Sequence, residues 1–181
     1  GTTSQFGVAR AEDDLLSKEP DFVIIEFYVN DERTEHFMET YEGLVRKVYT
    51  SKTKPAVLLV HNVFYNHGGN AQLMHGRIAR HYDLPAVSMQ STIYPEVVSG
   101  HIENRDITPD DLHPNDARHA LVASVITYFL DKVRTEDVKE LSEPDYPAPL
   151  TKNTYEKSIR HRNNDEKAVC SGFVADTSVQ R

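Results

Sequence analysis

Apolar and polar positions alternate along this chain with two different periods. Three short apolar runs rich in β-branched residues, 22–27, 55–60 and 85–89, predict buried β-strands. Elsewhere apolar residues recur every three or four positions, as on one face of an amphipathic helix. These segments predict helices over 7–17, 34–49, 69–82 and 117–133. Because strands alternate with helices, the pattern predicts an α/β fold whose parallel strands are joined by helical crossovers.

Polar residues follow the first predicted strand at its carboxyl end, where the apolar run stops at Asn30 and Asp31. In open α/β sheets, ligands bind at the carboxyl ends of the strands. The side-chain amide of Asn30 can donate a hydrogen bond to an oxygen that becomes negatively charged during a reaction. The alternative is an Asx turn that only closes the strand.

A second polar stretch, Asp110-Asp111-Leu112-His113-Pro114-Asn115-Asp116, precedes the last predicted helix. Asn115 or Asp116 can cap that helix, which places His113 on a loop rim just before a buried helix. A carboxylate such as Asp110, bonded to one ring nitrogen, fixes the histidine tautomer and stabilises the imidazolium. The stretch therefore indicates a general base. The alternative is a surface turn with a capping asparagine and an incidental histidine.

The segment that follows the second predicted strand, 61–69, is polar, aromatic and glycine-bearing. Its position predicts that it lines a pocket for an acyl group or a sugar, with His61, Asn62 and Tyr65 as substrate-binding candidates. The alternative is an ordinary solvated loop. The segment 93–108 leads to Asp110 and is expected to be a loop over the same pocket.

Taken together, these motifs resemble the SGNH (GDSL-type) hydrolase superfamily, and most closely its bacterial branch with carbohydrate-esterase-like members. Tyr28-Val29-Asn30-Asp31 matches the family's third block, and Asp110-Asp111-Leu112-His113 matches its fifth. Gly1-Thr2-Thr3-Ser4 is similar to the second block. The resemblance covers about residues 1–133. It departs from the family at Tyr28, where many members have glycine, and in the absence of the first block, Gly-Asp-Ser.

The resemblance implies a three-layer α/β/α, flavodoxin-like SGNH hydrolase fold with a parallel sheet, from which the N-terminal strand or strands are missing. It implies a serine, upstream of this chain, that attacks an ester, with His113 as the base and Asp110 as its orienting carboxylate. Asn30 and the Gly1 amide would form the oxyanion hole. The implied substrates are small acyl esters, foremost O-acetyl groups on carbohydrate.

Two other functions fit the same motifs. One is a lipase or thioesterase of the same superfamily with a longer acyl pocket. The other is a non-catalytic carbohydrate-binding fragment, which is consistent with the missing serine block. The missing strand also predicts a complementary N-terminal segment or a homodimer as partner, because a strand edge left open tends to pair with another chain.

Composition narrows these possibilities. The 181 residues carry a net charge of -8, which argues against nucleic acid or an anionic membrane as partner. No apolar run is long enough to span a bilayer. No cofactor or metal is predicted, because no histidine pair has the i, i+4 spacing of a helical zinc site. Of the chain's own serines, Ser88 falls within a strand pattern, and Ser4 is expected to cap the first helix.

The domain organisation is one core followed by a tail. Residues 1–141 form the predicted hydrolase core and 142–150 a proline-rich linker. Residues 151–181 are a polar extension, interpreted as the start of an accessory β module. Its modest apolar patch consists of Cys170, Phe173, Val174 and Val179. The cellular location stays open.

Overall fold

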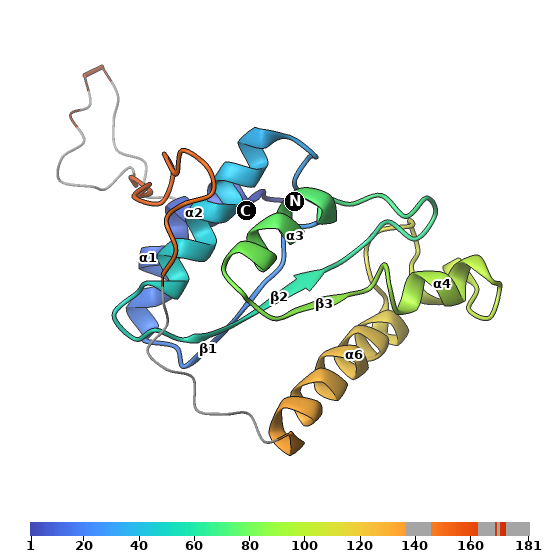
Figure 1. The fold of residues 1–181 in the computed structure, drawn as a ribbon. Coiled ribbons are helices and arrows are strands. Elements are labelled where there is room, and N and C mark those ends of the chain that lie inside the picture. Colours follow the sequence, from blue (N-terminus) through green and yellow to red (C-terminus); the bar gives the residue numbers. More distant parts are fainter. Residues whose placement is uncertain (137–145, 163–168, 170, 173–181) are drawn as a thin grey trace.

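Three parallel strands form the sheet in this computed structural model, which describes residues 1–136, 146–162, 169 and 171–172. They are β1 (Phe22–Ile25), β2 (Ala56–His61) and β3 (Ala86–Ser88), in the order β1-β2-β3 (Figure 1). Val23 lies opposite Val57, and Leu59 lies opposite Ala86. The predicted parallel α/β sheet is therefore confirmed, with each strand within two residues of its predicted ends.

Helices connect and follow the strands. They are α1 (Ser4–Asp14), the short 3-10 helix η1 (Leu16–Lys18), α2 (Glu35–Tyr49), α3 (Gln72–His81), α4 (Ile93–Val98), α5 (Asn104–Ile107) and α6 (Asp116–Thr135). The prediction that 93–108 is a loop was wrong. Ile93 and Ile107 are buried in a hydrophobic cluster together with Met89, and this packing supports two short helices in a mostly polar segment.

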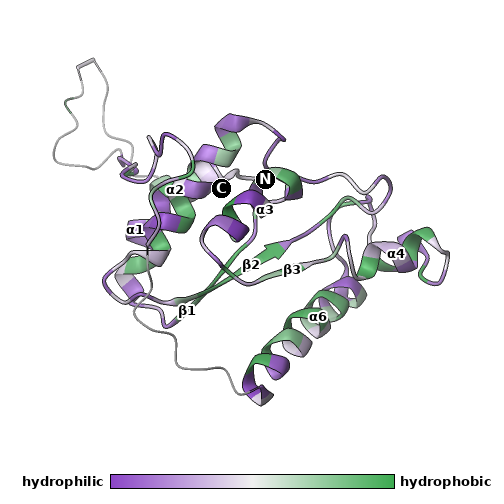
Figure 2. Cartoon of the chain, viewed as in Figure 1, coloured by the Kyte–Doolittle hydropathy of each residue, from purple (hydrophilic) through white to green (hydrophobic). Residues whose placement is uncertain are grey.

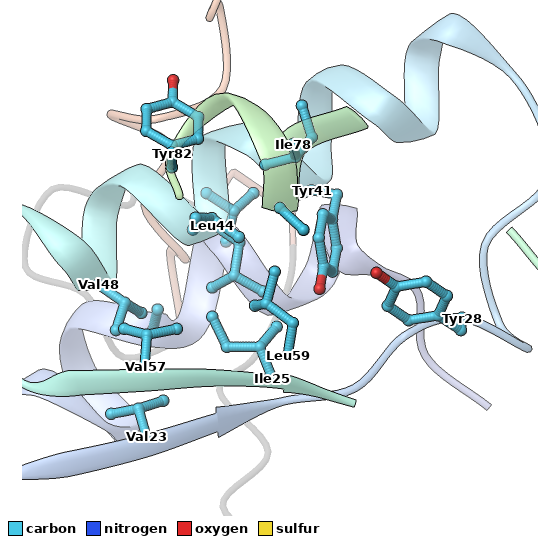
Figure 3. Packing of buried hydrophobic residues seen from close by; sticks show 14 of the residues in the cluster. Val23, Ile25, Tyr28, Tyr41, Leu44, Val48, Val57, Leu59, Ile78 and Tyr82 are labelled. Carbon is cyan, nitrogen blue, oxygen red and sulfur yellow. The ribbon is translucent and has the colours of Figure 1, made fainter. Parts of the chain in front are cut away.

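Helices α1, α2 and α3 cover one face of the sheet. Side chains of β1 and β2 that point to this face, Val23, Ile25 and Leu59, are buried against Val45 of α2 and Ile78 of α3. Figure 3 shows this core, in which the aromatic rings of Tyr28 and Tyr41 lie at one end. The alternate residues of the strands and the residues at helical spacing in α2 thus pack together in one hydrophobic cluster.

Helix α6 lies on the opposite face of the sheet, so the fold has three layers (Figure 1). Leu58 and Val60 of β2 are buried on this face. The apolar stripe of α6 packs against them, but each of its residues is only half-buried: Leu121, Val122, Val125, Ile126 and Phe129. The prediction of a buried helix was therefore wrong in part, because the apolar face of α6 is half-buried and not fully buried. In Figure 2, hydrophobic colour runs along the strands and along part of α6.

Residues 146–162, here called the strap, lie along α2. The carboxylate of Glu42 in α2 accepts hydrogen bonds from the backbone of Leu150, at 2.6 Å, and of Thr151, at 2.8 Å. Arg46 forms a 2.8 Å ion pair with Glu156. In this described part of the predicted linker and extension, the chain forms no strand. Residues 137–145 and the apolar patch of Cys170, Phe173, Val174 and Val179 lie outside the described residues.

None of the described helices combines the length and the hydrophobicity needed to cross a membrane.

Candidate active site

Asp110 and His113 form a hydrogen-bonded pair in the turn that precedes α6. The Nδ1 atom of His113 lies 2.6 Å from Oδ2 of Asp110. The other carboxylate oxygen, Oδ1, accepts the backbone N–H groups of Leu112 at 3.1 Å and of His113 at 2.7 Å. One carboxylate therefore holds both the backbone and the ring of the histidine. This is the arrangement expected for a histidine whose tautomer is fixed by a carboxylate.

The local sequence favours this turn. Asp111 has a φ of 72°, a left-handed conformation that Asp tolerates better than most residues. Its backbone carbonyl accepts the N–H of Tyr65 at 3.2 Å, and its carboxylate accepts the side-chain amide of Asn104 at 2.5 Å. Asn115 caps α6 by accepting the N–H of Arg118 at 3.0 Å, which confirms the predicted cap.

The electrostatics of the pair follow from its contacts. The hydrogen bond from His113, together with the backbone N–H groups, holds the pKa of Asp110 well below its usual range. The carboxylate is therefore ionised whenever the imidazole works as a base. The side chain of His113 is 73 % exposed, so its second ring nitrogen faces solvent. A histidine held this way can accept a proton from a nucleophile and return it to a leaving group.

Gly1 and Asn30 lie in contact beyond the end of β1. A Cβ atom placed on Gly1 would come within 2.0 Å of the side-chain nitrogen of Asn30, so any side chain at this position would displace that amide. The backbone N–H groups of Asn30 and Asp31 both donate to the carbonyl of Phe27, at 3.1 and 2.9 Å. A tight turn thus places the side-chain amide of Asn30 beside Gly1.

The carboxylate of Asp31 holds this turn from beneath. It accepts the N–H of Ser4, the first residue of α1, at 2.8 Å, and it lies 3.1 Å from Nε2 of His75 in α3. The predicted capping role of Ser4 was wrong, because its hydroxyl is buried and pairs with that of Thr40 at 2.6 Å. Ser4 is therefore a packing residue that joins α1 to α2.

His61, the last residue of β2, points into the molecule. Its ring stacks on Tyr28 with centroids 3.7 Å apart, and its Nε2 atom is hydrogen-bonded to the hydroxyl of Tyr28. Burial lowers the pKa of His61 to about 3, so its imidazole is neutral at physiological pH. His61 also lines a cavity of about 570 Å³ that extends beside α3 and β3.

Asn62 and Tyr65 also make internal contacts. The side-chain oxygen of Asn62 accepts a hydrogen bond from Arg118 at 2.8 Å, and Tyr65 is buried with its ring under the same guanidinium. Substrate contacts at His61, Asn62 and Tyr65 stay a prediction. The observed contacts of Asn62 and Tyr65 connect the end of β2 to the turn that carries His113.

The segment after β2 connects the two halves of the site. Tyr65 donates its N–H to Asp111 beside His113, and Ala71 donates its N–H to the carbonyl of Tyr28 beside Asn30, at 2.8 Å. The pairs Asp110–His113 and Gly1–Asn30 are thereby attached to the same loop at the carboxyl end of β2. Among the described residues, no group of three histidine, cysteine or acidic side chains is arranged to hold a metal ion.

Sequence reasoning missed Arg118, which is fully buried beneath the His113 turn. The signal was present, because Arg118 falls at helical spacing with Leu121, Val122 and Val125 on the apolar face of α6. A charged residue on an apolar stripe indicates a buried partner. The identity of that partner depends on contacts far apart in sequence.

No protein-family model matches the chain, and no curated protein matches it. It is similar to the crystal structure of a two-domain esterase (CEX) active on acetylated mannans, with 88% identity and a TM-score of 0.94. The match covers 99% of this chain and 48% of that one. A structure of such an esterase co-crystallized with mannopentaose matches with 87% identity, a TM-score of 0.92 and the same coverage. The chain thus spans about half the length of these proteins.

Proposed function

We propose that this chain is the histidine-bearing part of a serine ester hydrolase of the SGNH type that removes acetyl groups from carbohydrate, with mannan as the substrate. The observation that carries the proposal is the Asp110–His113 pair, in which a low-pKa carboxylate orients an exposed imidazole. The 88% identity to a mannan-active esterase supports the choice of substrate.

The proposed mechanism needs a serine, which we place upstream of this chain. His113 takes the proton of the serine hydroxyl as the serine attacks the acetyl carbonyl, and Asp110 stabilises the imidazolium. The imidazolium then gives its proton to the sugar hydroxyl that leaves. Water attacks the acetyl-serine with His113 again as the base. The Asn30 amide and the Gly1 N–H stabilise the oxyanion in both steps.

The cavity beside α3 has a partly polar lining that suits sugar hydroxyls, and of the predicted site residues only His61 contributes to that lining. Side chains with amide or guanidinium groups contribute to its lining, namely Arg33, Asn70, Gln72, Arg80 and Gln90. Such groups donate and accept hydrogen bonds, as sugar hydroxyls require. A lipase or thioesterase would instead need an apolar channel for the acyl chain.

The test is release of acetate from acetylated mannan by the complete protein that contains this chain. His113→Ala is expected to lower the rate of release by several orders of magnitude. His101→Ala is the matched control, because His101 is also exposed and its Nδ1 atom lies 2.9 Å from the carboxylate of Glu96. Normal release by His113→Ala would refute the proposal. A series of nitrophenyl esters of increasing acyl length separates the alternatives, since a lipase would prefer long chains and a pure binding module would hydrolyse none.

A further inference from the structure

Arg118 is the one residue of α6 that is buried, at 0% exposure. It lies in the first turn of the helix, directly after the turn that carries His113. Burying a guanidinium costs several kcal/mol, about as much as a small domain's whole net stability, unless its charge and its N–H groups are matched. A residue of this kind is therefore retained for the contacts that it makes.

The guanidinium connects two loops. One terminal nitrogen donates to the carbonyl of Leu112, the residue before His113. The other donates to the side chain of Asn62, just after β2, at 2.8 Å. The plane of the group lies over the ring of Tyr65, 4.3 Å from its centroid. The Leu112 carbonyl is thus tied to the carboxyl end of the central strand.

Glu26, which follows β1, lies within electrostatic range of Arg118. Burial raises the pKa of Glu26 to about 7, while the attraction of Arg118 acts in the opposite direction. The guanidinium therefore contacts the loop after β2 and the turn before α6, and it lies within electrostatic range of a third place, the end of β1. All three lie at the carboxyl end of the sheet, where the proposed site is built.

We propose that Arg118 is a positioning residue of the active site. By holding the Leu112 carbonyl close to Asn62 and Tyr65, it fixes the position and orientation of the His113 ring relative to the sheet. This proposal rests on the proposed function, since it assigns a role relative to the general base. The task requires arginine, because a lysine ammonium cannot donate to two separated acceptors in one plane and stack on a ring.

The consequence is a specific kinetic effect. Without Arg118, the Asp110–His113 hydrogen bond is retained, but the turn is free to shift against the sheet. A displacement of about 1 Å at a catalytic group costs about 100-fold in rate. Arg118→Ala and Arg118→Lys are therefore expected to lower kcat by about 10- to 100-fold, with KM for nitrophenyl acetate changed less than about twofold.

The experiment uses the complete protein at a temperature below the melting point of every variant. Arg134→Ala is the matched control, because Arg134 lies in the same helix, is exposed and pairs with Asp131 among the described residues. A double-mutant cycle gives the readout that a purely structural role would not produce. If Arg118 acts through His113, Arg118→Ala has no further effect on the residual activity of His113→Ala.

Three outcomes overturn the proposal. The first is a kcat of folded Arg118→Ala within twofold of that of Arg134→Ala, and the second is a raised KM with an unchanged kcat. The third is full additivity of the effects of Arg118→Ala and His113→Ala. If Arg118→Ala does not fold, Asn62→Ala decides, because it removes one anchor and keeps the guanidinium. It should then lower kcat several-fold, and an unchanged kcat refutes the positioning role. His113→Ala, assayed in parallel, tests the proposed function separately, since only its activity bears on the general base.

Discussion

At the scale of single residues, catalysis in this account depends on how one imidazole and one amide are held. Asp110 contacts both the ring and the backbone N–H of His113. Asn30 is in contact with Gly1, at a position where only glycine leaves room for the amide. These residues belong to short motifs, so their identity was predictable from local sequence.

Three substitutions in the complete protein are expected to form a graded series. His113→Ala should lower kcat by several orders of magnitude, because the base is lost. Asn30→Ala should cost about 100-fold or more, the usual effect of one oxyanion donor. Asp110→Asn should fall between them, because its task is orientation. Steady-state hydrolysis of nitrophenyl acetate measures the series, and near-normal turnover by His113→Ala would remove histidine from the mechanism.

The free energy of unfolding is expected to decrease as the pH is lowered, because His61 is buried in its neutral form. Its folded-state pKa is about 3, against about 6.5 in an unfolded chain. Between these pH values the unfolded protein binds more protons than the folded protein, so the free energy of unfolding rises with pH. The contribution of His61 to stability is therefore complete above about pH 6.5 and is lost as the pH falls from 6.5 towards 3. The loss approaches about 1.4 kcal/mol per pH unit.

Urea unfolding at pH 7, 6 and 5 measures this effect. In His61→Gln, which cannot titrate in this range, the pH slope should be smaller than in the unmodified protein, while His101→Gln at the surface is the control. Equal slopes for His61→Gln and the unmodified protein would show that the buried imidazole does not contribute to acid sensitivity.

At the scale of elements, the spacing of apolar residues predicted the helices and strands whose pattern is set by local sequence. It did not predict the elements that depend on contacts between residues far apart in sequence. Helices α2 and α6 and the three strands appeared at their expected places because their apolar positions repeat over many residues. Helices α4 and α5 did not, because they are only six and four residues long and depend on the burial of Ile93 and Ile107. The role of Arg118 was missed for the same reason, since its partner Asn62 lies 56 positions away.

The strap along α2 gives a prediction at this scale. Glu42 is fully buried and accepts hydrogen bonds from the backbone of Leu150 and Thr151, from the hydroxyl of Thr151 and from Tyr82. Glu42→Ala leaves these donors without an acceptor and is expected to cost about 3–5 kcal/mol in the free energy of unfolding.

Glu39→Ala is the matched control, because Glu39 is on the same helix but is only half-buried, and it contacts the strap at Thr154, whose N–H it accepts at 2.8 Å. Its expected cost is about 1 kcal/mol or less. Thermal unfolding of the complete protein compares the two variants. Equal costs would mean that Glu42 does not anchor the strap.

At the scale of the whole molecule, the sheet has an apolar edge. Strand β1 pairs with β2 on one side only within the described sheet. Phe22 and Ile24 point to the same side as α6, but they are 42% and 47% exposed. Apolar residues on an unpaired strand promote pairing with another chain.

Isolated residues 1–181 are therefore expected to self-associate, and Ile24→Lys should reduce the association measured by sedimentation velocity. The isolated chain is also expected to show no esterase activity above a His113→Ala control. A monodisperse monomer would contradict the first expectation. Turnover sensitive to serine inhibitors would contradict the second and direct the search for a nucleophile to Ser4, Ser88 and Ser91.

In the proposed mechanism, His113 activates a serine that lies upstream of residues 1–181. A fluorophosphonate, which reacts with activated serines, tests it in the complete protein, with the labelled residue located by mass spectrometry. One labelled serine upstream of residues 1–181 is expected, with a labelling rate that falls at least about 100-fold in His113→Ala and is unchanged in His101→Ala. Labelling of a serine within residues 1–181, or equal rates in His113→Ala and the unmodified protein, would contradict it.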